Sequence, residues 1–438
     1  MILSALVAVT VFSVLGKTAT VAKEMAIAWR FGVSPEVDAY LFIFNAVNWP
    51  ITVWFSVLTL VLIPLEARIR RESPQQLAGF RAQLLGATVI LGVVIAGIAR
   101  LVMPVVLTSP AVGLPANTVG FALQALPFLC WFALPGVLVS LYSTWMMSNG
   151  SNANTLLEGV PALAICLAAL VSGGIGSLVW GTVLGVGLQA VCVAWPRVVS
   201  GDVRAPAFRG DSPAWQWFTK GFATLLVGQA IFGVTTLVDQ FFAAGLGEGA
   251  ISSLSYAARL VSMVNAVVSI AVTRSTLPAF ARVAVDDPRR LRRVALRWAS
   301  LLLFVGVAVV VIGWPLAPWV VRMLFEHGTF NASDSNSVAT LLRFGLLQLP
   351  FFFPSLVLVS LHSSRGGYRI LALSGLLGLI VKVVSTWLLI KPFGLNALMM
   401  SAAITYLANA LWLLAVALLR PERAVLYPGG STEANTTQ

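Results

Sequence analysis

Charged side chains are scarce in this chain: they make up 10% of its 438 residues, whereas 58% of the residues are hydrophobic. Soluble domains carry roughly 25% charged residues, so no extended stretch of this sequence can form a separate soluble domain. Histidine and cysteine are also rare, with two and three copies. Cys130, Cys166 and Cys192 lie in apolar stretches without metal-ligand or disulfide spacing. We therefore expect buried thiols, no metal site and no cofactor.

Signatures of catalysis are absent as well. The sequence has no HExxH, GxSxG or P-loop motif. The basic loops are short and lack interleaved aromatic residues, which disfavours nucleic-acid binding. We expect a protein that is not an enzyme and does not use ATP directly.

Long apolar runs recur from one end of the chain to the other, and the mean hydropathy is +0.91. Each run is about 20 residues long, the length needed to cross a hydrocarbon core of roughly 30 Å. We predict an all-α polytopic membrane protein with about twelve transmembrane helices. These lie near residues 1–31, 36–65, 80–107, 117–147, 156–172, 175–195, 216–245, 250–281, 296–325, 336–362, 369–390 and 395–419. The first run lacks a small-residue cleavage site, so we interpret it as a retained helix.

Lys and Arg residues outside the spans gather in alternate loops, which predicts that those loops and both termini are cytoplasmic. The cytoplasmic set includes Arg68, Arg70, Arg71 and Arg81 in one loop and Arg282, Arg289, Arg290, Arg292, Arg293 and Arg297 in another. The formal net charge of +12 mostly reflects this topology and adds attraction to anionic lipids.

The longest polar interruption between spans is near residues 196–220 and is rich in Pro and Gly. We predict two six-helix lobes around a central cavity, a common transporter plan. The expected boundaries are an N-terminal lobe at 1–198, a cytoplasmic linker at 199–215, a C-terminal lobe at 216–420 and a flexible cytoplasmic tail at 421–438. A weak internal echo agrees, because Glu24 and Asp239 each precede a glycine by eight residues.

Six basic side chains fall within the expected spans. They are Lys17, Lys23, Arg259, Arg274, Arg343 and Lys382. Each costs roughly 2.5–3.5 kcal/mol at the middle of a bilayer on insertion scales. We expect them to face a wet cavity, and an excess of cations there suits an anionic substrate.

Each candidate has a competing interpretation. Lys17 can instead extend its ammonium to the head groups. Arg259 suits a bidentate phosphate clamp, because guanidinium keeps its proton, but a structural pair with Asp239 or Glu24 is the alternative. Arg274 either extends the cationic track or anchors at head groups.

Asp38 follows Ser34-Pro35-Glu36 at the start of a span. It is either a favourable acid at a helix start or a gate residue that pairs with a cation when the outer face closes. Lys23 and Glu24 are adjacent, and we expect that they cannot pair well across one helix turn.

Several segments together resemble the MurJ (MviN) lipid II flippase family. They are Ala26–Gly32 followed by Val37–Tyr40, Leu237–Asp239, Ser255–Leu260, Leu324–Phe330 and Asn409–Leu411. The resemblance covers nearly the whole chain. It implies a two-lobed bundle of the multidrug/oligosaccharidyl-lipid/polysaccharide superfamily in the bacterial cytoplasmic membrane. It also implies that Lys17, Lys23 and Arg259 bind a pyrophosphate head in the cavity, and that Glu24 and Asp38 act at the gate.

Three departures from the family pattern suggest a divergent member, one that serves an exopolysaccharide or another polyprenyl-linked glycan. Lysines replace both helix-one arginines, which keeps charge but loses bidentate geometry. The basic and glycine-rich stretch of helix two is replaced by Pro50–Val57. The chain also ends after twelve expected helices. Some family members are thought to bind sodium with a helix-seven acid, and we hypothesise that Lys382 pairs with Asp239 in place of that ion.

The leading hypothesis is a flippase for an undecaprenyl-pyrophosphate-type lipid-linked oligosaccharide, working beside glycan-assembly enzymes. One alternative is a cation-coupled drug exporter, which the mostly basic cavity candidates disfavour. The other is a membrane scaffold for glycan assembly that transports nothing, for which neutralising the cations is harmless.

Overall fold

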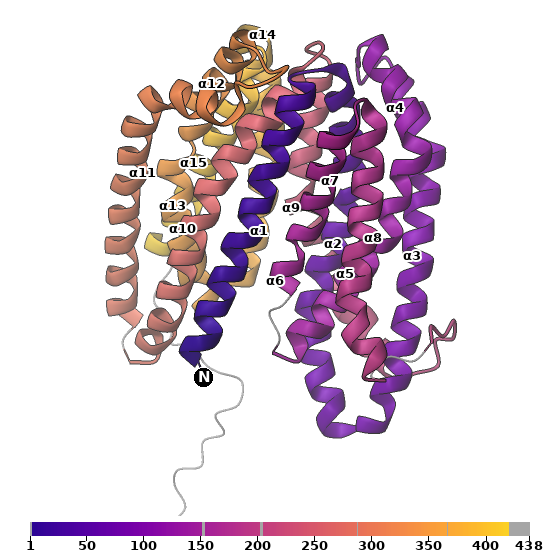
Figure 1. Cartoon of the computed structure of the whole chain (residues 1–438). Helices are drawn as coiled ribbons and strands as arrows, with labels where there is room; N and C mark the ends of the chain where they lie inside the picture. Colours follow the sequence, from indigo (N-terminus) through magenta and orange to yellow (C-terminus); the bar gives the residue numbers. More distant parts are fainter. Residues whose placement is uncertain (1, 151–153, 202–204, 287, 366, 420–438) are drawn as a thin grey trace, which may run out of the picture. The chain divides into compact units, whose positions relative to one another are not determined.

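The computed structural model describes residues 2–150, 154–201, 205–286, 288–365 and 367–419. Side chains are not described for residues 2–15, 224, 232, 273–279, 281–286, 288–290 and 368. Every regular element in these ranges is a helix (Figure 1). This agrees with the expected fold class, because a helix satisfies its own backbone hydrogen bonds in lipid, where water cannot.

The helices follow the predicted spans closely. They are α1 (Ile2–Phe31), α2 (Pro35–Glu72), α3 (Pro74–Thr108), α4 (Ala116–Leu129), the 3-10 turn η1 (Cys130–Phe132), α5 (Ala133–Ser148), α6 (Asn154–Leu157), α7 (Gly159–Val171), α8 (Ile175–Val199), α9 (Ala214–Ala244), α10 (Ala250–Asp286), α11 (Pro288–Phe325), α12 (Ala332–Leu346), α13 (Leu349–Ser364), α14 (Tyr368–Phe393) and α15 (Asn396–Leu419). Within the described residues, ten helices are long and apolar enough to span a membrane, or eleven if α12 and α13 form one bent span. Helix α1 covers the first expected span and is not among these.

Local sequence explains where helices begin and bend. Helix α2 starts at Pro35 because the Ser34 hydroxyl accepts a hydrogen bond from the Val37 N–H and proline suits the first turn. The fourth expected span is interrupted by η1 just after Pro127. The tenth bends by 42° between α12 and α13, where Pro350 opens α13.

The chain divides into two compact units, each described by itself. The first comprises Met1–Ala257 and Pro318–Leu341, and the second comprises Ala258–Ala317 and Leu342–Gln438. The first unit holds most of the fully buried aromatic side chains, among them Tyr40, Phe80 and Trp145. Within it, the Tyr40 and Thr182 hydroxyls lie 2.8 Å apart and join α2 to α8.

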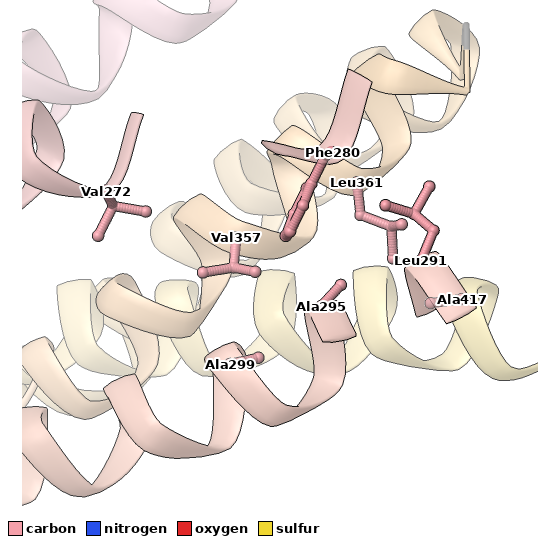
Figure 2. Close-up of a cluster of buried hydrophobic side chains, with 8 residues drawn as sticks. All are labelled: Val272, Phe280, Leu291, Ala295, Ala299, Val357, Leu361 and Ala417. Carbon is pink, nitrogen blue, oxygen red and sulfur yellow. The ribbon is translucent and has the colours of Figure 1, made fainter. Parts of the chain in front are cut away.

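The second unit is built around small and branched apolar side chains. Figure 2 shows one such cluster, to which α10, α11, α13 and α15 all contribute. Its members are Val272, Phe280, Leu291, Ala295, Ala299, Val357, Leu361 and Ala417. Alanines at the contacts let helices approach closely, as is common where lipid removes the usual hydrophobic drive for helix association. The expected tail at 421–438 lies outside the described residues.

Candidate functional site

Lys23, one of the predicted cavity cations, is paired with the adjacent Glu24. Its Nζ lies 2.8 Å from the Glu24 Oε1, and the two side chains are only 13% and 7% exposed. The expectation that adjacent residues cannot pair well was wrong. The long lysine stem lets the ammonium curl onto the next carboxylate, and burial of both groups makes an unpaired charge costly. In this state, therefore, Glu24 already neutralises Lys23.

Lys17 lies two turns earlier on α1 and is exposed. Its positive charge attracts the carboxylate of Glu158, which is also exposed and lies at the junction of α6 and α7. Helix α1 approaches α6 closely here, because a Cβ on Gly16 would lie 3.2 Å from the Thr155 carbonyl oxygen. An exposed Lys17 is compatible with both interpretations, the cavity cation and the head-group anchor.

Asp38 is 1% exposed, and its carboxylate binds backbone amides. Its Oδ2 accepts a hydrogen bond from the Gly249 N–H at 2.6 Å, and its Oδ1 accepts one from the Ser252 N–H at 2.7 Å. These N–H groups belong to the start of α10, where helical amides lack intrahelical partners and the dipole favours an anion. Asp38 therefore caps a helix that is far away in sequence. One expectation was that it pairs with a cation, whereas the contacts found here are with backbone amides.

Further bonds close the same region of the first unit. The Tyr256 hydroxyl of α10 donates to the Gly32 carbonyl oxygen at 3.1 Å. The Thr329 N–H donates to the Trp29 carbonyl oxygen at 2.9 Å. We call these contacts and those of Asp38 the Asp38 seal. They join residues 29–38 to residues of the predicted C-terminal half.

Two glycines make the seal possible. Gly32 has φ of +59°, and a Cβ there would lie 2.9 Å from the Thr329 carbonyl oxygen. Gly328 has φ of +66°, and a Cβ there would overlap the Trp29 carbonyl oxygen. Only glycine adopts such φ values without strain and permits such close backbone approach. Beneath them, Phe325 and Phe330 pack against the Tyr256 ring.

The two predicted arginines of α10 are less fully defined. Arg259 is half-buried at the start of the second unit, and its carbonyl accepts a hydrogen bond from the Ser262 hydroxyl. The backbone of Arg274 belongs to α10, but its side chain lies outside the described part of the structure. Their roles as phosphate ligands stay predictions.

Lys382 is 3% exposed, in a polar cluster between α14 and α15. Its ammonium donates to the Leu398 carbonyl oxygen at 2.8 Å and to the Ser401 hydroxyl at 2.9 Å. The Thr386 hydroxyl lies 2.8 Å from the same Ser401 oxygen. Asp239, its predicted partner, belongs to the first unit and Lys382 to the second, so their pairing stays a prediction.

Arg343 has a structural role that the sequence analysis missed. Its Nε donates to the Trp314 carbonyl oxygen at 3.0 Å. The helical donor for that carbonyl would be the N–H of residue 318, which is proline and has none. Arg343 thus satisfies a carbonyl freed by Pro318, and the proline four residues after Trp314 was the available signal. We expected Arg343 to face a wet cavity, and this contact shows that its guanidinium also has a protein partner.

Comparison with known proteins identifies the family. Residues 27–425 match the family described as "Lipid II flippase MurJ". The chain belongs to the MurJ family.

Curated relatives of the MurJ family are moderately similar. A protein of Bdellovibrio bacteriovorus strain HD100, named probable lipid II flippase MurJ, is 27% identical over 242 residues, which cover 54% of this chain and 46% of that protein. A protein of Rhizobium meliloti strain 1021 with the same name is 26% identical over 248 residues, covering 54% and 45%. The matched stretch therefore spans about half the length of these relatives.

Solved structures share the fold. The structure titled "Lipid II flippase MurJ, inward closed conformation" has a TM-score of 0.81 at 16% identity, covering 95% of this chain and 88% of that one. An inward-facing multidrug resistance MATE family transporter of the MOP superfamily has a TM-score of 0.75 at 15% identity, covering 93% and 98%. At these identities the likeness concerns the fold alone, a bundle shared by MurJ and MATE proteins.

One buried charge cluster of this MurJ-family chain was missed from the sequence. Glu66 is 0% exposed, and its carboxylate accepts hydrogen bonds from the Arg81 Nε at 2.8 Å and Nη2 at 2.9 Å. The Ser148 hydroxyl donates to it at 2.7 Å, and Arg70 lies at 3.4 Å. The sequence pattern assigns Arg81 to a cytoplasmic loop, but it lies within α3 and is 5% exposed. The signal was Glu66 itself, a lone acid at the end of an apolar run.

Metal ligands do not gather anywhere in the described ranges: no three His, Cys, Asp or Glu side chains there are placed to hold an ion. Cationic side chains and helix N-termini can bind an anion, and a carboxylate that holds a cation can be exchanged for that anion.

Proposed function

We propose that this MurJ-family chain moves a polyprenyl-pyrophosphate-linked glycan from the cytoplasmic to the periplasmic leaflet by alternating access. The glycan is lipid II-like or an exopolysaccharide repeat unit. The observation that carries the proposal is the Asp38 seal, because a transporter of this kind must close one mouth while the other is open. The seal joins the two predicted halves through bonds that a change of state can break and remake.

Lys23 supplies the second part of the mechanism. Its ammonium is held by Glu24, and a pyrophosphate carries more negative charge and more acceptor oxygens than one carboxylate. The arriving head group therefore displaces Glu24 from Lys23. Lys17, Arg259 and Arg274 are the further cations of the head-group site, and the two arginines can bind phosphate in bidentate fashion.

Complementation of a flippase-depleted strain tests this function. We expect Lys23→Ala and Arg259→Ala to lose rescue at normal membrane levels, and Lys23→Arg to keep it, because the charge is retained. Full rescue by both alanine variants would contradict the flippase and favour the scaffold, which does not need the cations.

The protein's own cation, Lys382, takes the place of the sodium ion in this proposal. The Lys382 ammonium donates to one carbonyl and one hydroxyl oxygen, and the Thr386 hydroxyl bonds to the same Ser401 oxygen. Oxygen atoms of this kind would also suit an alkali ion. We propose that it pairs with Asp239 and that transport needs no sodium. In proteoliposomes, flipping should be equal in sodium and in choline buffer. Sodium-dependent flipping that is lost in Asp239→Asn but unchanged in Lys382→Ala would contradict this assignment.

A cation-coupled drug exporter is the second candidate, favoured by the fold shared with a MATE transporter. The predicted cavity residues disfavour it, because the basic side chains among them outnumber the carboxylates that a cationic drug would need. Efflux of ethidium from cells that express the chain distinguishes the two, since the flippase leaves ethidium accumulation unchanged.

The chain is a multi-pass membrane protein, and we propose that both termini face the cytoplasm of a bacterium. The excess of Lys and Arg in alternate loops supports this orientation. Alkaline phosphatase fused after residue 201 should be inactive, and a fusion after Gly113 in the opposite loop should be active. The reverse pattern would contradict the orientation.

A further inference from the structure

The predicted linker lies against α3. The Ala207 N–H donates to the Ala82 carbonyl oxygen at 2.9 Å. A Cβ on Gly86, one turn further along α3, would overlap the Ala207 backbone. Such an approach needs glycine at position 86. The described part of the linker therefore packs on a helix of the first unit and does not cross open space.

Gln83 fastens the end of the linker. Its Oε1 accepts hydrogen bonds from the Trp215 Nε1 at 2.8 Å and from the Ser212 N–H at 3.3 Å. Its Nε2 donates to the Asp211 carboxylate. The oxygen and the nitrogen of one side-chain amide thus bind three residues at the end of the linker and the start of α9.

Aromatic packing continues the attachment into α9. The Phe80 ring of α3 is fully buried, with centroids 5.7 Å from Trp215 and 6.2 Å from Phe218. Trp54 of α2 is 7% exposed and lies 6.5 Å from Phe218 and 5.4 Å from Phe222. Large aromatic side chains dominate the energy of such contacts.

Helix α2 meets the same stretch at two further points. The Arg68 guanidinium lies 4.1 Å from the centre of the Trp217 ring. A Cβ on Gly221 would lie 3.9 Å from the Val61 Cβ, so α9 presents a glycine to a branched side chain. Polar, aromatic and backbone contacts thus hold the chain from Ser212 to Phe222 against α2 and α3.

We propose that residues 205–222, the anchored segment, move with α2 and α3 during transport. The moving boundary between the halves then lies beyond Phe222 along the chain, and not in the linker at 199–215. This rests on the proposed alternating-access function. It follows that the seam between α2 and the first half of α9 stays closed, and that the lipid-linked substrate enters and leaves elsewhere.

A disulfide across this seam tests the inference. In a background with Cys130, Cys166 and Cys192 replaced by alanine, Val61→Cys and Gly221→Cys place Cβ atoms 3.9 Å apart, close to the usual disulfide spacing of about 3.8 Å. We expect the oxidised protein to flip a fluorescent polyprenyl-pyrophosphate glycan within about twofold of the reduced protein. A drop of tenfold or more that a reducing agent reverses would overturn the anchored segment. The two single-cysteine variants, oxidised in parallel, are the controls.

Cross-linking itself is a second readout that does not depend on the cargo. A seam that never opens should cross-link nearly completely and in one phase in native membranes. Failure to reach about half completion would also overturn the inference. If neither the reduced pair nor the cysteine-free parent flips the probe, the proposed function fails, and the anchored segment is judged on the cross-linking alone.

Discussion

The Asp38 seal and the anchored segment both join residues that precede the linker to later parts of the chain, yet they are built differently. The seal depends on hydrogen bonds, with Asp38 holding two amides of α10 and Tyr256 and Thr329 each holding one carbonyl. The anchored segment adds a buried aromatic cluster around Phe80 and Phe218 to its hydrogen bonds. When the seal opens, water can replace the lost hydrogen bonds. Water cannot replace the contacts of a buried apolar surface in the same way, so exposing that surface costs free energy. From this difference we infer that the seal opens during transport and that the anchored segment stays in place.

Locking the seal should have the largest effect on transport. In the cysteine-free background, Val33→Cys and Gly249→Cys bring Cβ atoms 3.7 Å apart. Oxidation should abolish flipping, at least a hundredfold, and a reducing agent should restore it, in contrast to the Val61→Cys, Gly221→Cys pair. Equal tolerance of both disulfides would remove the distinction between the two regions. The reduced pair serves as the control, because Gly249 has φ of +80° and the substitution itself adds strain.

Truncating the aromatic cluster should have the largest effect on stability. Phe218→Ala removes a side chain that is 4% exposed and leaves a cavity between α2, α3 and α9. We expect a loss of about 3–5 kcal/mol in unfolding free energy, measured by denaturation in detergent. The exposed Phe241→Ala on the same helix is the matched control. A loss below about 1 kcal/mol for Phe218→Ala would show that the cluster does not hold α9.

Removing the charge of the seal should change the opening equilibrium. Asp38→Asn keeps the shape but weakens two hydrogen bonds to a charged group, each worth about 1.5–3 kcal/mol. We expect a membrane-impermeant thiol reagent to label Val33→Cys about ten times faster in this variant, since 1.4 kcal/mol is tenfold in an equilibrium. Glu36→Gln, the other acid in the first turn of α2, should leave the labelling rate unchanged. Unchanged labelling in Asp38→Asn would show that the carboxylate does not hold the seal.

Loosening the linker should have the smallest effect. Gln83→Ala removes three hydrogen bonds of a half-buried amide, each worth at least about 0.5 kcal/mol after exchange with water. Hydrogen exchange at residues 212–216 should rise by roughly tenfold, while exchange within residues 228–240 stays the same. Faster exchange along the whole of α9 would mean that the helix is held as one piece, and not by its first half.

The helices of this protein could be predicted from the sequence, because hydrophobic length and proline placement act locally. The interruption after Pro127 and the bend before Pro350 are examples. The site could be predicted only in its residue types. Lys23, Glu24 and Asp38 stood out as charges in apolar surroundings, but their partners did not.

The partners were missed for physical reasons. Asp38 binds backbone amides, which leave no mark in the sequence because every residue carries one. Lys23 pairs with an adjacent residue. Helix geometry argues against such a pair if the side chains are taken as rigid, but the flexible lysine stem allows it. The Arg81–Glu66 pair joins α3 to α2 within one unit, and the positive-inside pattern counts Arg81 without knowing that the helix buries it.

Transfer of a lipid-linked glycan between leaflets is the most direct test of the central claim. Purified protein would be reconstituted with a fluorescent polyprenyl-pyrophosphate glycan, and the fraction reaching the opposite leaflet would be followed by quenching from outside. The account predicts transfer well above that of protein-free vesicles, retained in Lys23→Arg and reduced at least tenfold in Lys23→Ala. Transfer no faster than in protein-free vesicles, with every variant equal to the parent, would contradict it.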